Sequence, residues 1–352
     1  MLMKTQENMG ISNITITGSS AAFPQTGQWM HNRDIHALIF GSAWQEKMQE
    51  KKLDPDYYEK VLGFENRFWV HTPGMPILHT ELTSADLMLE AAERAIEDSG
   101  IAKNEIDFII TVTITSPRYS TSMGPYIAGR LGINAPAIEM KTGCASNIFS
   151  IVLSSQIIAG GARNVLITCG ETITKILKLN PRMAYAGGDA GAAVVISKSS
   201  DPAKGILASY INSNGSFSGH MGVPGLLPPN QFDLEHENYF MEYSDTAEDF
   251  LNQAWSEIPE ILYKKAGIAS QDIDCLIPHQ VNKNRTAFAA NAANISLEKT
   301  VNIIGKIANC GSAGVLLALD DARKNKACKK DKTIMLLSAG GGISWGGLII
   351  KT

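Results

Sequence analysis

A twelve-residue segment occurs twice in this chain of 352 residues, and the repetition restricts the possible fold more than any other feature. Residues 99–110 (SGIAKNEIDFII) and 266–277 (AGIASQDIDCLI) share Gly, Ile, Ala, Ile, Asp and Ile at an offset of 167 residues. In both copies a helical pattern stops at a glycine, which is typical of a helix C-terminus, and an apolar run follows that indicates a buried strand. The chain is therefore predicted to contain two related halves of roughly domain size, about 170 residues each.

The same offset relates two turns further along the chain. Cys144, in the turn KTGCAS, corresponds to Gly311 in the turn ANCGSAG. Each turn precedes an apolar helix and then a strand, expected at 145–159 and 164–169 in the first half and at 312–323 and 333–338 in the second. Alternating helices and strands predict an α/β fold, and pseudo-twofold symmetry would bring the two turns to one interface. We place the halves at 1–200 and 201–352, with the cysteine in the first.

Cys144 is the strongest candidate for a nucleophile. It lies on a glycine turn directly before a predicted helix, where the helix dipole favours a thiolate, so a lowered thiol pKa is expected. Two polar segments of the second half supply candidate partners: His279 in PHQVN and Asn309 in the ANCGSAG turn. A cysteine, a histidine and an asparagine, each at a strand end or turn, predict an acyl-transfer site.

Composition excludes several classes of protein. The net charge of −4 gives no reason to expect nucleic acid as a partner. Residues 1–13 lack the apolar core of a signal peptide, and no apolar run is long enough to span a bilayer, so we expect a cytoplasmic protein that does not enter membranes. The five cysteines form no CxxC pair, and we expect no metal site and reduced structural thiols at positions other than 144, namely Cys169, Cys275, Cys310 and Cys328.

Three further segments carry weaker signals. Residues 212–238 are rich in Gly, Pro, Ser and Asn and predict an irregular connection that acts as a lid or tunnel wall. The charged segment 45–58 predicts one surface helix. The glycine-rich segment 187–191 matches no complete dinucleotide or phosphate-binding fingerprint, and tight backbone packing is expected there.

The chain resembles the thiolase-fold condensing enzymes, most closely β-ketoacyl-acyl-carrier-protein synthase III. The resemblance rests on the cysteine turn, the Pro-His-Gln-x-Asn segment, the asparagine turn and the glycine-rich end at 340–346, and it covers nearly the whole chain from the first strand at 14–18. It implies a duplicated five-layer αβαβα architecture, an acyltransferase and a homodimer.

Residue by residue, the resemblance implies a role for each part of the site. Cys144 would be the acylated nucleophile, and His279 and Asn309 would bind the carbonyl of the second thioester. The backbone N–H groups of Cys144 and Gly341 would form the oxyanion hole. The implied reaction is a decarboxylative Claisen condensation of an acyl thioester with a malonyl thioester. The substrates would be carried on CoA or on the phosphopantetheine of an acyl carrier protein, without a further cofactor.

Three positions depart from the family pattern. Val61 stands where an arginine contacts CoA, although Tyr57 nearby could stack on the adenine. Asn284 stands where an arginine docks the carrier protein, and the flanking Lys283 and Arg285 could substitute for it. Ala339 replaces a phenylalanine before the glycine triplet. These departures favour a carrier-protein donor and a specialised fatty-acid or polyketide-type pathway over a housekeeping role.

Other reactions on the same fold stay open at this point. The acyl group of Cys144 could pass to a hydroxyl or amine, with His279 as general base. Head-to-head condensation without decarboxylation uses a glutamate on the loop before the cysteine in related enzymes, and residues 108–138 contain no Asp or Glu. A non-catalytic subunit of a ketosynthase heterodimer is a further alternative, but such subunits usually lose the cysteine or the histidine, and both are present here.

Overall fold

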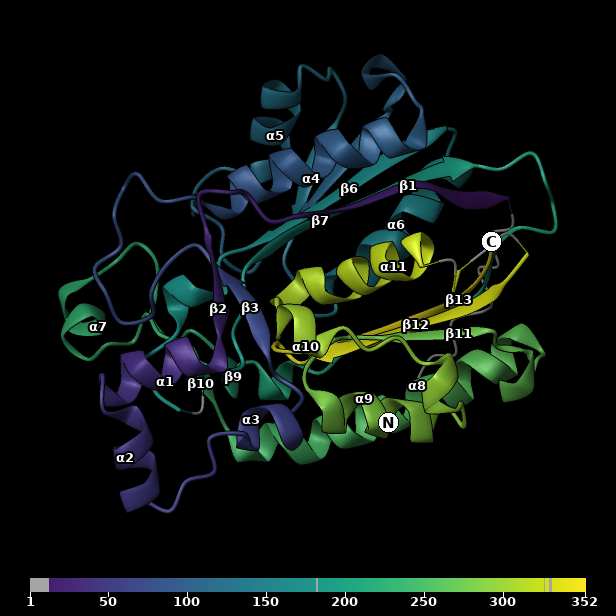
Figure 1. Cartoon of the computed structure of the whole chain (residues 1–352). Coiled ribbons are helices and arrows are strands. Elements are labelled where there is room, and N and C mark those ends of the chain that lie inside the picture. The colour runs from purple at the N-terminus through teal and green to yellow at the C-terminus, as the bar shows by residue number, and fades with distance from the viewer. Residues whose placement is uncertain (1–12, 182, 326, 329–330) are drawn as a thin grey trace.

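Two β-sheets organise the structure (Figure 1), a computed structural model that describes residues 13–181, 183–325, 327–328 and 331–352. The first sheet has the strand order β1-β7-β6-β4-β5. Its strands are β1 (Ile14–Ala22), β4 (Phe108–Val112), β5 (Ala137–Met140), β6 (Asn164–Glu171) and β7 (Ala190–Lys198). β7 pairs antiparallel with β1 and β6, whereas β4 is parallel to β5 and β6.

The second sheet repeats this arrangement with one strand fewer. Its order is β11-β12-β13-β8, built from β8 (Gly205–Ser213), β11 (Cys275–Pro278), β12 (Thr333–Gly340) and β13 (Ser344–Lys351). β13 is antiparallel to β8 and β12, and β11 is parallel to β12. The strands β6, β7, β12 and β13 are almost wholly buried, as expected for strands covered by helices on both faces.

Helices form three layers around the sheets, as Figure 1 shows. The outer face of the first sheet carries α4 (Ser84–Ser99) and α5 (Met123–Leu131), and the outer face of the second carries α8 (Asp245–Ala266) and α9 (Lys283–Ala292). Between the sheets lie α6 (Ser146–Ala159) and α11 (Gly314–Lys324), which contact strands of both. The predicted five-layer αβαβα architecture is therefore confirmed.

Local sequence explains the shared helix ends of the two halves. α4 ends at Gly100 with φ 69°, and α8 ends at Gly267 with φ 67°. This left-handed conformation suits glycine, which has no Cβ to clash. The short 3₁₀ helices η1 (Lys103–Glu105) and η4 (Ser270–Asp272) follow in each half and lead into β4 and β11. The repeated sequence thus encodes the same helix–turn–strand unit twice.

The remaining elements cluster at one end of the sheets, on the left in Figure 1. They are α1 (Asn32–Phe40), α2 (Trp44–Glu50), α3 (Tyr57–Lys60), α7 (Gln231–Glu235), β2 (Gln28–His31), β3 (Asn66–Trp69), β9 (Met221–Gly222) and β10 (Glu242–Tyr243). The further short helices are α10 (Ile304–Ile307), η2 (Ile173–Ile176), η3 (Gly215–Phe217), η5 (Leu297–Lys299) and η6 (Gly311–Ala313). In the part of the chain that the structure describes, no helix has the length and apolarity that a bilayer span requires.

Two expectations about connections need correction. Residues 45–58 do not form one helix: α2 stops at Glu50 and α3 starts at Tyr57. Lys52 adopts a positive φ of 54° in the break, and Pro55 disfavours helical backbone in the residue before it. The connection 212–238 is irregular as predicted over most of its length, but η3, β9 and α7 lie within it.

Candidate active site

The Cys144 turn joins the end of β5 to the start of α6. Gly143 has φ 62°, and the Ser146 hydroxyl closes the turn by donating to the Gly143 carbonyl at 2.7 Å and accepting from the Thr142 N–H at 2.8 Å. Ser338 on β12 donates to the Cys144 carbonyl at 2.8 Å. The Cys144 turn of the first half is therefore anchored directly to the second sheet.

The glycine-rich segment between β12 and β13 packs against this turn. A Cβ atom on Gly340 would lie 2.6 Å from Cys144 Cβ and 2.9 Å from Cys144 Sγ, and a Cβ on Gly143 would overlap the Gly341 carbonyl oxygen. Only glycine permits such a close approach. The backbone N–H groups of Gly341 and Cys144 act on the sulfur and lower the pKa of the Cys144 thiol. The oxyanion hole expected from these two groups stays a prediction.

Desolvation of the sulfur nevertheless outweighs these two N–H groups, although Cys144 as a whole residue is only partly buried. Desolvation, followed by the nearby Glu171 carboxyl group, raises the pKa of the Cys144 thiol to about 12. The predicted lowering of this pKa is wrong. The dipole at a helix terminus lowers the pKa of a thiol only within the first turn of the helix and next to solvent. The Cys144 sulfur instead lies among residues from both halves, where an anion loses its hydration. The resting form is a thiol that has to lose its proton as it attacks.

His279 follows the end of β11 and is 1% exposed. Its backbone N–H donates to the Leu337 carbonyl on β12 at 2.8 Å, and its ring lies against Gly314, where a Cβ would come within 2.9 Å of Nδ1. Neither ring nitrogen has a hydrogen-bond partner among the described residues. Burial lowers the pKa of His279 to about 4, so the ring is neutral at physiological pH.

Asn309 is held by contacts to the first half. Its N–H donates to the Ala186 carbonyl at 2.8 Å, and its carbonyl accepts from the Gly188 N–H at 3.0 Å. The side-chain Oδ1 accepts from the Gly311 N–H at 3.0 Å. That bond orients the side chain, and the amide NH₂ of Asn309, for which no bond to a described residue is found, is left to donate to a substrate.

Three residues connect the loops that carry Cys144, His279 and Asn309. Asn147, in the first turn of α6, donates through Nδ2 to the Ser312 carbonyl at 2.7 Å and to the Cys144 carbonyl at 3.2 Å. On β12, adjacent residues contact the two halves of the site: Leu337 accepts from His279, and Ser338 donates to Cys144. Cys144, His279 and Asn309 therefore lie on loops that meet at the C-terminal end of β12.

Glu171 also lies at this junction, and the sequence interpretation missed it. It ends β6, is fully buried, and contacts Ser312 in the asparagine loop. Desolvation raises the pKa of Glu171 to about 7 despite the hydrogen bonds that it accepts. An acidic residue that closes an otherwise apolar strand was the available signal, because a buried carboxyl group requires partners.

The expected carrier-binding residues differ in their surroundings. Tyr57 is 45% exposed, and Lys283 packs against Gly63 and donates its backbone N–H to the Leu62 carbonyl at 2.8 Å. The structure thus brings Lys283 to the segment that contains Tyr57. Arg285 is engaged elsewhere: its guanidinium bonds Asn252 on α8, and Nη2 lies 3.5 Å from Glu248. Lys283, which is exposed, is therefore freer than Arg285 to meet a partner.

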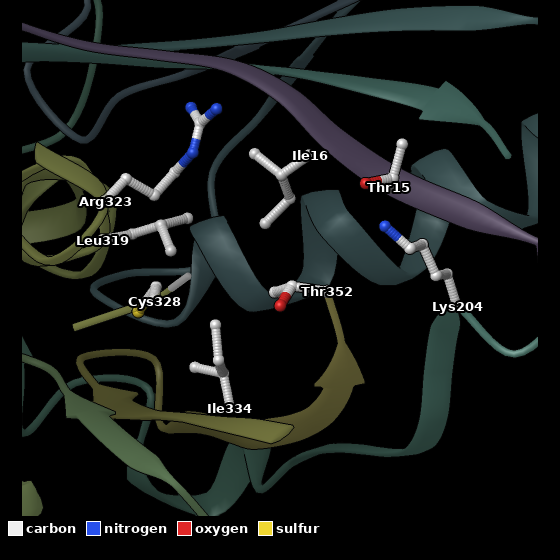
Figure 2. Close-up of a pocket in the computed structure, with 8 residues that line it drawn as sticks. All are labelled: Thr15, Ile16, Lys204, Leu319, Arg323, Cys328, Ile334 and Thr352. Atoms are coloured by element: carbon white, nitrogen blue, oxygen red, sulfur yellow. The ribbon is translucent and has the colours of Figure 1, made fainter. Parts of the chain in front are cut away.

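A cavity of about 190 Å³ lies away from these loops (Figure 2). It is lined by residues of β1, α11 and the C-terminal strands, among them Ile16, Arg323 and Ile334. Ile334 is near the start of β12, whereas the Cys144 turn meets the far end of that strand, so the cavity is not part of the candidate site. Among the described residues, no cluster of three His, Cys, Asp or Glu side chains is arranged to hold a metal ion.

Comparison with known proteins identifies the family of the chain. Residues 138–215 match the family model described as 3-oxoacyl-[acyl-carrier-protein] synthase III, and residues 263–352 match the model of its C-terminal part. The β-ketoacyl-[acyl-carrier-protein] synthase III of Caldanaerobacter subterraneus subsp. tengcongensis is 31% identical over 329 residues, which cover 90% of this chain and 98% of the relative.

Solved structures show the same fold at lower identity. The 3-oxoacyl-[acyl-carrier-protein] synthase III from Aquifex aeolicus has a TM-score of 0.81 at 22% identity, over 96% of this chain and 100% of that one. The priming β-ketosynthase from the R1128 polyketide biosynthetic pathway has a TM-score of 0.80 at 19% identity, over 99% and 98%. The chain therefore belongs to the 3-oxoacyl-acyl-carrier-protein synthase III family and is an acyltransferase with the thiolase fold.

Proposed function

We propose that the protein joins an acyl thioester to a malonyl thioester by decarboxylative Claisen condensation, with Cys144, His279 and Asn309 as its catalytic residues. One observation carries the proposal: the neutral His279 ring, buried beside the strand end that holds the Cys144 turn, has both nitrogens unpartnered among the described residues. Buried polar groups without a partner are uncommon, and a substrate oxygen would satisfy them.

The first step is transfer of the acyl group to Cys144. The sulfur attacks the thioester carbonyl, and the oxyanion that forms accepts hydrogen bonds from the Cys144 and Gly341 N–H groups. Because desolvation keeps the thiol protonated, the proton has to leave the sulfur as it attacks. The proton then passes to the departing carrier thiol.

The second step forms the carbon–carbon bond. The carbonyl oxygen of a malonyl thioester accepts hydrogen bonds from an His279 ring N–H and from the Asn309 amide. Cleavage of the bond to the carboxylate releases CO₂ and leaves an enolate on that oxygen. The enolate carbon attacks the acyl carbonyl on Cys144, and the Cys144 thiolate leaves and recovers a proton. Asn309 donates without titrating, so it supplies no proton to quench the carbanion.

The surface around Val61 and Lys283 bears on which thioester donates the acyl group. Val61 is 41% exposed and offers no positive charge to a nucleotide phosphate, whereas Lys60 and Lys283 lie next to each other, with Lys283 Nζ 3.5 Å from the Lys60 carbonyl. A carrier protein with an acidic helix suits this surface better than CoA, and this supports a specialised fatty-acid or polyketide-type pathway. The implied homodimer stays a prediction.

Mass spectrometry of the intact protein tests each step. Incubation with a panel of acyl thioesters on CoA and on carrier protein should add one acyl group at Cys144. Malonyl carrier protein should then remove that mass and yield a β-ketoacyl carrier product. His279→Ala and Asn309→Ala should retain acylation but lose the second step. If the acyl group leaves only when a hydroxyl or amine acceptor is supplied, the enzyme is a transferase to that acceptor and the condensation proposal is wrong.

A further inference from the structure

Glu171 is a buried carboxyl group with an unusual set of partners. Its oxygens accept from the Ile114 N–H at 3.0 Å, from the Thr115 hydroxyl at 2.8 Å and from the Thr113 hydroxyl at 3.2 Å, and the Ser312 hydroxyl donates to it as well. No lysine, arginine or histidine of the described residues forms an ion pair with it. The charge of the ionised form is thus compensated by hydrogen bonds alone.

Ser312 links this carboxyl group to both halves of the site. Its hydroxyl contacts Glu171, and its carbonyl accepts from Asn147, which also donates to the Cys144 carbonyl. On the other side, a Cβ on Gly311 would meet Glu171 Cγ at 3.5 Å, and the Gly311 N–H holds the Asn309 oxygen. The path from Glu171 to Asn309 therefore passes through Gly311 alone, and the path to Cys144 passes through Ser312 and Asn147.

We propose that Glu171 is a positioning residue for acyl transfer: it anchors Ser312, and with it the Cys144 and Asn309 loops, and it places a negative charge beside the nucleophile. The proposal rests on the proposed function only in taking Cys144 as the nucleophile and condensation as the reaction.

The charge has a direct consequence for Cys144. The titratable groups that face Glu171 are Cys144 from the loop before α6, Cys169 from β6, and Cys310 from the loop that carries Asn309. A second carboxyl group, Asp189, acts in turn on Cys310. Each of these groups is either neutral or negatively charged. Because a nearby negative charge disfavours an anion, ionised Glu171 disfavours the thiolate form of Cys144. With the pKa of Glu171 raised to about 7, the carboxyl group changes charge in the range where enzymes work.

Alkylation of Cys144 by iodoacetamide measures this coupling without any substrate. In the wild type, the logarithm of the rate should rise with pH, flatten above about pH 7 where Glu171 ionises, and rise again at higher pH. Glu171→Gln should remove the flat region and react about threefold faster or more at pH 8.5. Peptide mapping confirms the labelled residue, and Cys144→Ala gives the background from the other cysteines.

The positioning role predicts a simultaneous loss in condensation. A glutamine keeps the shape of the side chain, but its NH₂ group cannot accept the hydrogen bond that Ser312 or Thr115 donates. Glu171→Gln should therefore condense about tenfold more slowly or worse, while Cys144 becomes easier to alkylate. A variant that is merely misfolded would not combine slower condensation with a defined, steeper alkylation profile.

Two controls separate charge from anchoring. Asp189→Asn changes a second buried acid, which is bonded to Thr174 and to the Val70 N–H. Because the charge of Asp189 acts on Cys310 and not directly on Cys144, the flat region of the alkylation profile should persist in this variant. Ser312→Ala removes a hydrogen bond that lowers the pKa of Glu171, so the flat region should move to higher pH while condensation slows. This second variant decides the question if Glu171→Gln does not fold.

Superimposable alkylation profiles of the wild type, Glu171→Gln and Ser312→Ala would overturn the proposal, and so would full condensation activity in Glu171→Gln. Absence of condensation in the wild type would instead contradict the proposed function. The alkylation profile would still decide whether Glu171 acts on Cys144.

Discussion

The two halves of the molecule share one strand order and differ at one edge. In the first sheet, β5 pairs with β4 from Ile109↔Ala137 to Val112↔Met140. At the equivalent edge of the second sheet, only the single bridge Leu276↔Thr300 is present among the described residues, and the short helix α10 follows it. The fifth strand of the first half has thus been replaced in the second half by a bridge and a helical turn.

This difference determines how each functional loop is held. Cys144 follows its strand within a few residues and is fixed by its own half and by β12. Asn309 follows α10, and its backbone pairs with Gly187 of the first half. The two equivalent turns therefore differ in support: the turn with Cys144 is held next to its own strand, whereas the turn with Asn309 depends on the first half for its position.

The halves also bury titratable groups of opposite kind. Glu171 of the first half has a raised pKa, and His279 of the second has a lowered one, because desolvation disfavours the charged form of both. Four predictions, in order of decreasing effect, test how far the two halves differ.

The largest effect is expected from the cysteines of the two equivalent turns. Cys144→Ala should abolish acylation, a loss of about a thousandfold or more, because no other group can form the thioester. Cys310→Ala should leave most of it, since Cys310 is fully buried and its thiol donates to the Ile307 carbonyl. Intact-mass measurement after one turnover checks both. Acylation that survives in Cys144→Ala but not in Cys310→Ala would reverse the assignment.

The second-largest effect is expected from alanine substitutions of the glycines in the two turns, which should slow acylation to different extents. Gly143 and Gly311 have φ 62° and 54°, so alanine is strained at both. At Gly143 the added Cβ would also strike the Gly341 carbonyl and displace an oxyanion donor, which typically slows catalysis about a hundredfold to a thousandfold. At Gly311 the Cβ meets only the flexible end of Ile173, at 3.0 Å, and Glu171, so a smaller loss is expected. Single-turnover acylation rates measure both, and equal losses would argue against the oxyanion role of Gly341.

The dependence of stability on pH should reveal the two buried groups separately. The raised pKa of Glu171 gives stability that is present below about pH 4.5 and is lost as pH rises through about 7. The lowered pKa of His279 gives stability that is present above about pH 6.5 and is lost as pH falls toward 4. Between pH 5 and pH 8 each contribution changes by about 2 kcal/mol, in opposite directions.

Urea unfolding of the wild type, His279→Gln and Glu171→Gln at both pH values measures these slopes. His279→Gln should lose less free energy of unfolding on going from pH 8 to pH 5 than the wild type does. Glu171→Gln should lose less on going from pH 5 to pH 8. Identical slopes in all three proteins would show that neither group remains neutral in the folded state.

The smallest effect concerns Lys283 and Arg285. Lys283→Glu should slow acylation from a carrier protein by less than about tenfold, through lost surface charge, and leave a small thioester unaffected. Arg285→Ala should change the rate little but lower the midpoint of thermal unfolding, because Arg285 is bonded to Asn252 and close to Glu248. Rates and melting curves on both variants check this, and a rate loss in Arg285→Ala alone would restore it as the docking cation.

Local patterns in the sequence were sufficient to predict the fold and the gathering of Cys144, His279 and Asn309 at one place. The repeated segment, its glycine caps and its apolar runs predicted both halves, because helix ends and buried strands depend on neighbouring residues. The motifs around Cys144, His279 and Asn309 led to the family that the comparisons show. The break in 45–58 was missed, although Pro55 and the turn before it were visible in the sequence.

Tertiary structure alone decided the chemistry of the site. The pKa of Cys144 rises because Gly340 and Glu171, distant in sequence, enclose its sulfur, and no local pattern reports that enclosure. Glu171 gains its role from Ser312, 141 residues away, and Arg285 is occupied by residues of α8. Desolvation and hydrogen bonding depend on which surfaces meet when the two halves pack, and this is why the sequence predicted which residues would gather but not how they would titrate.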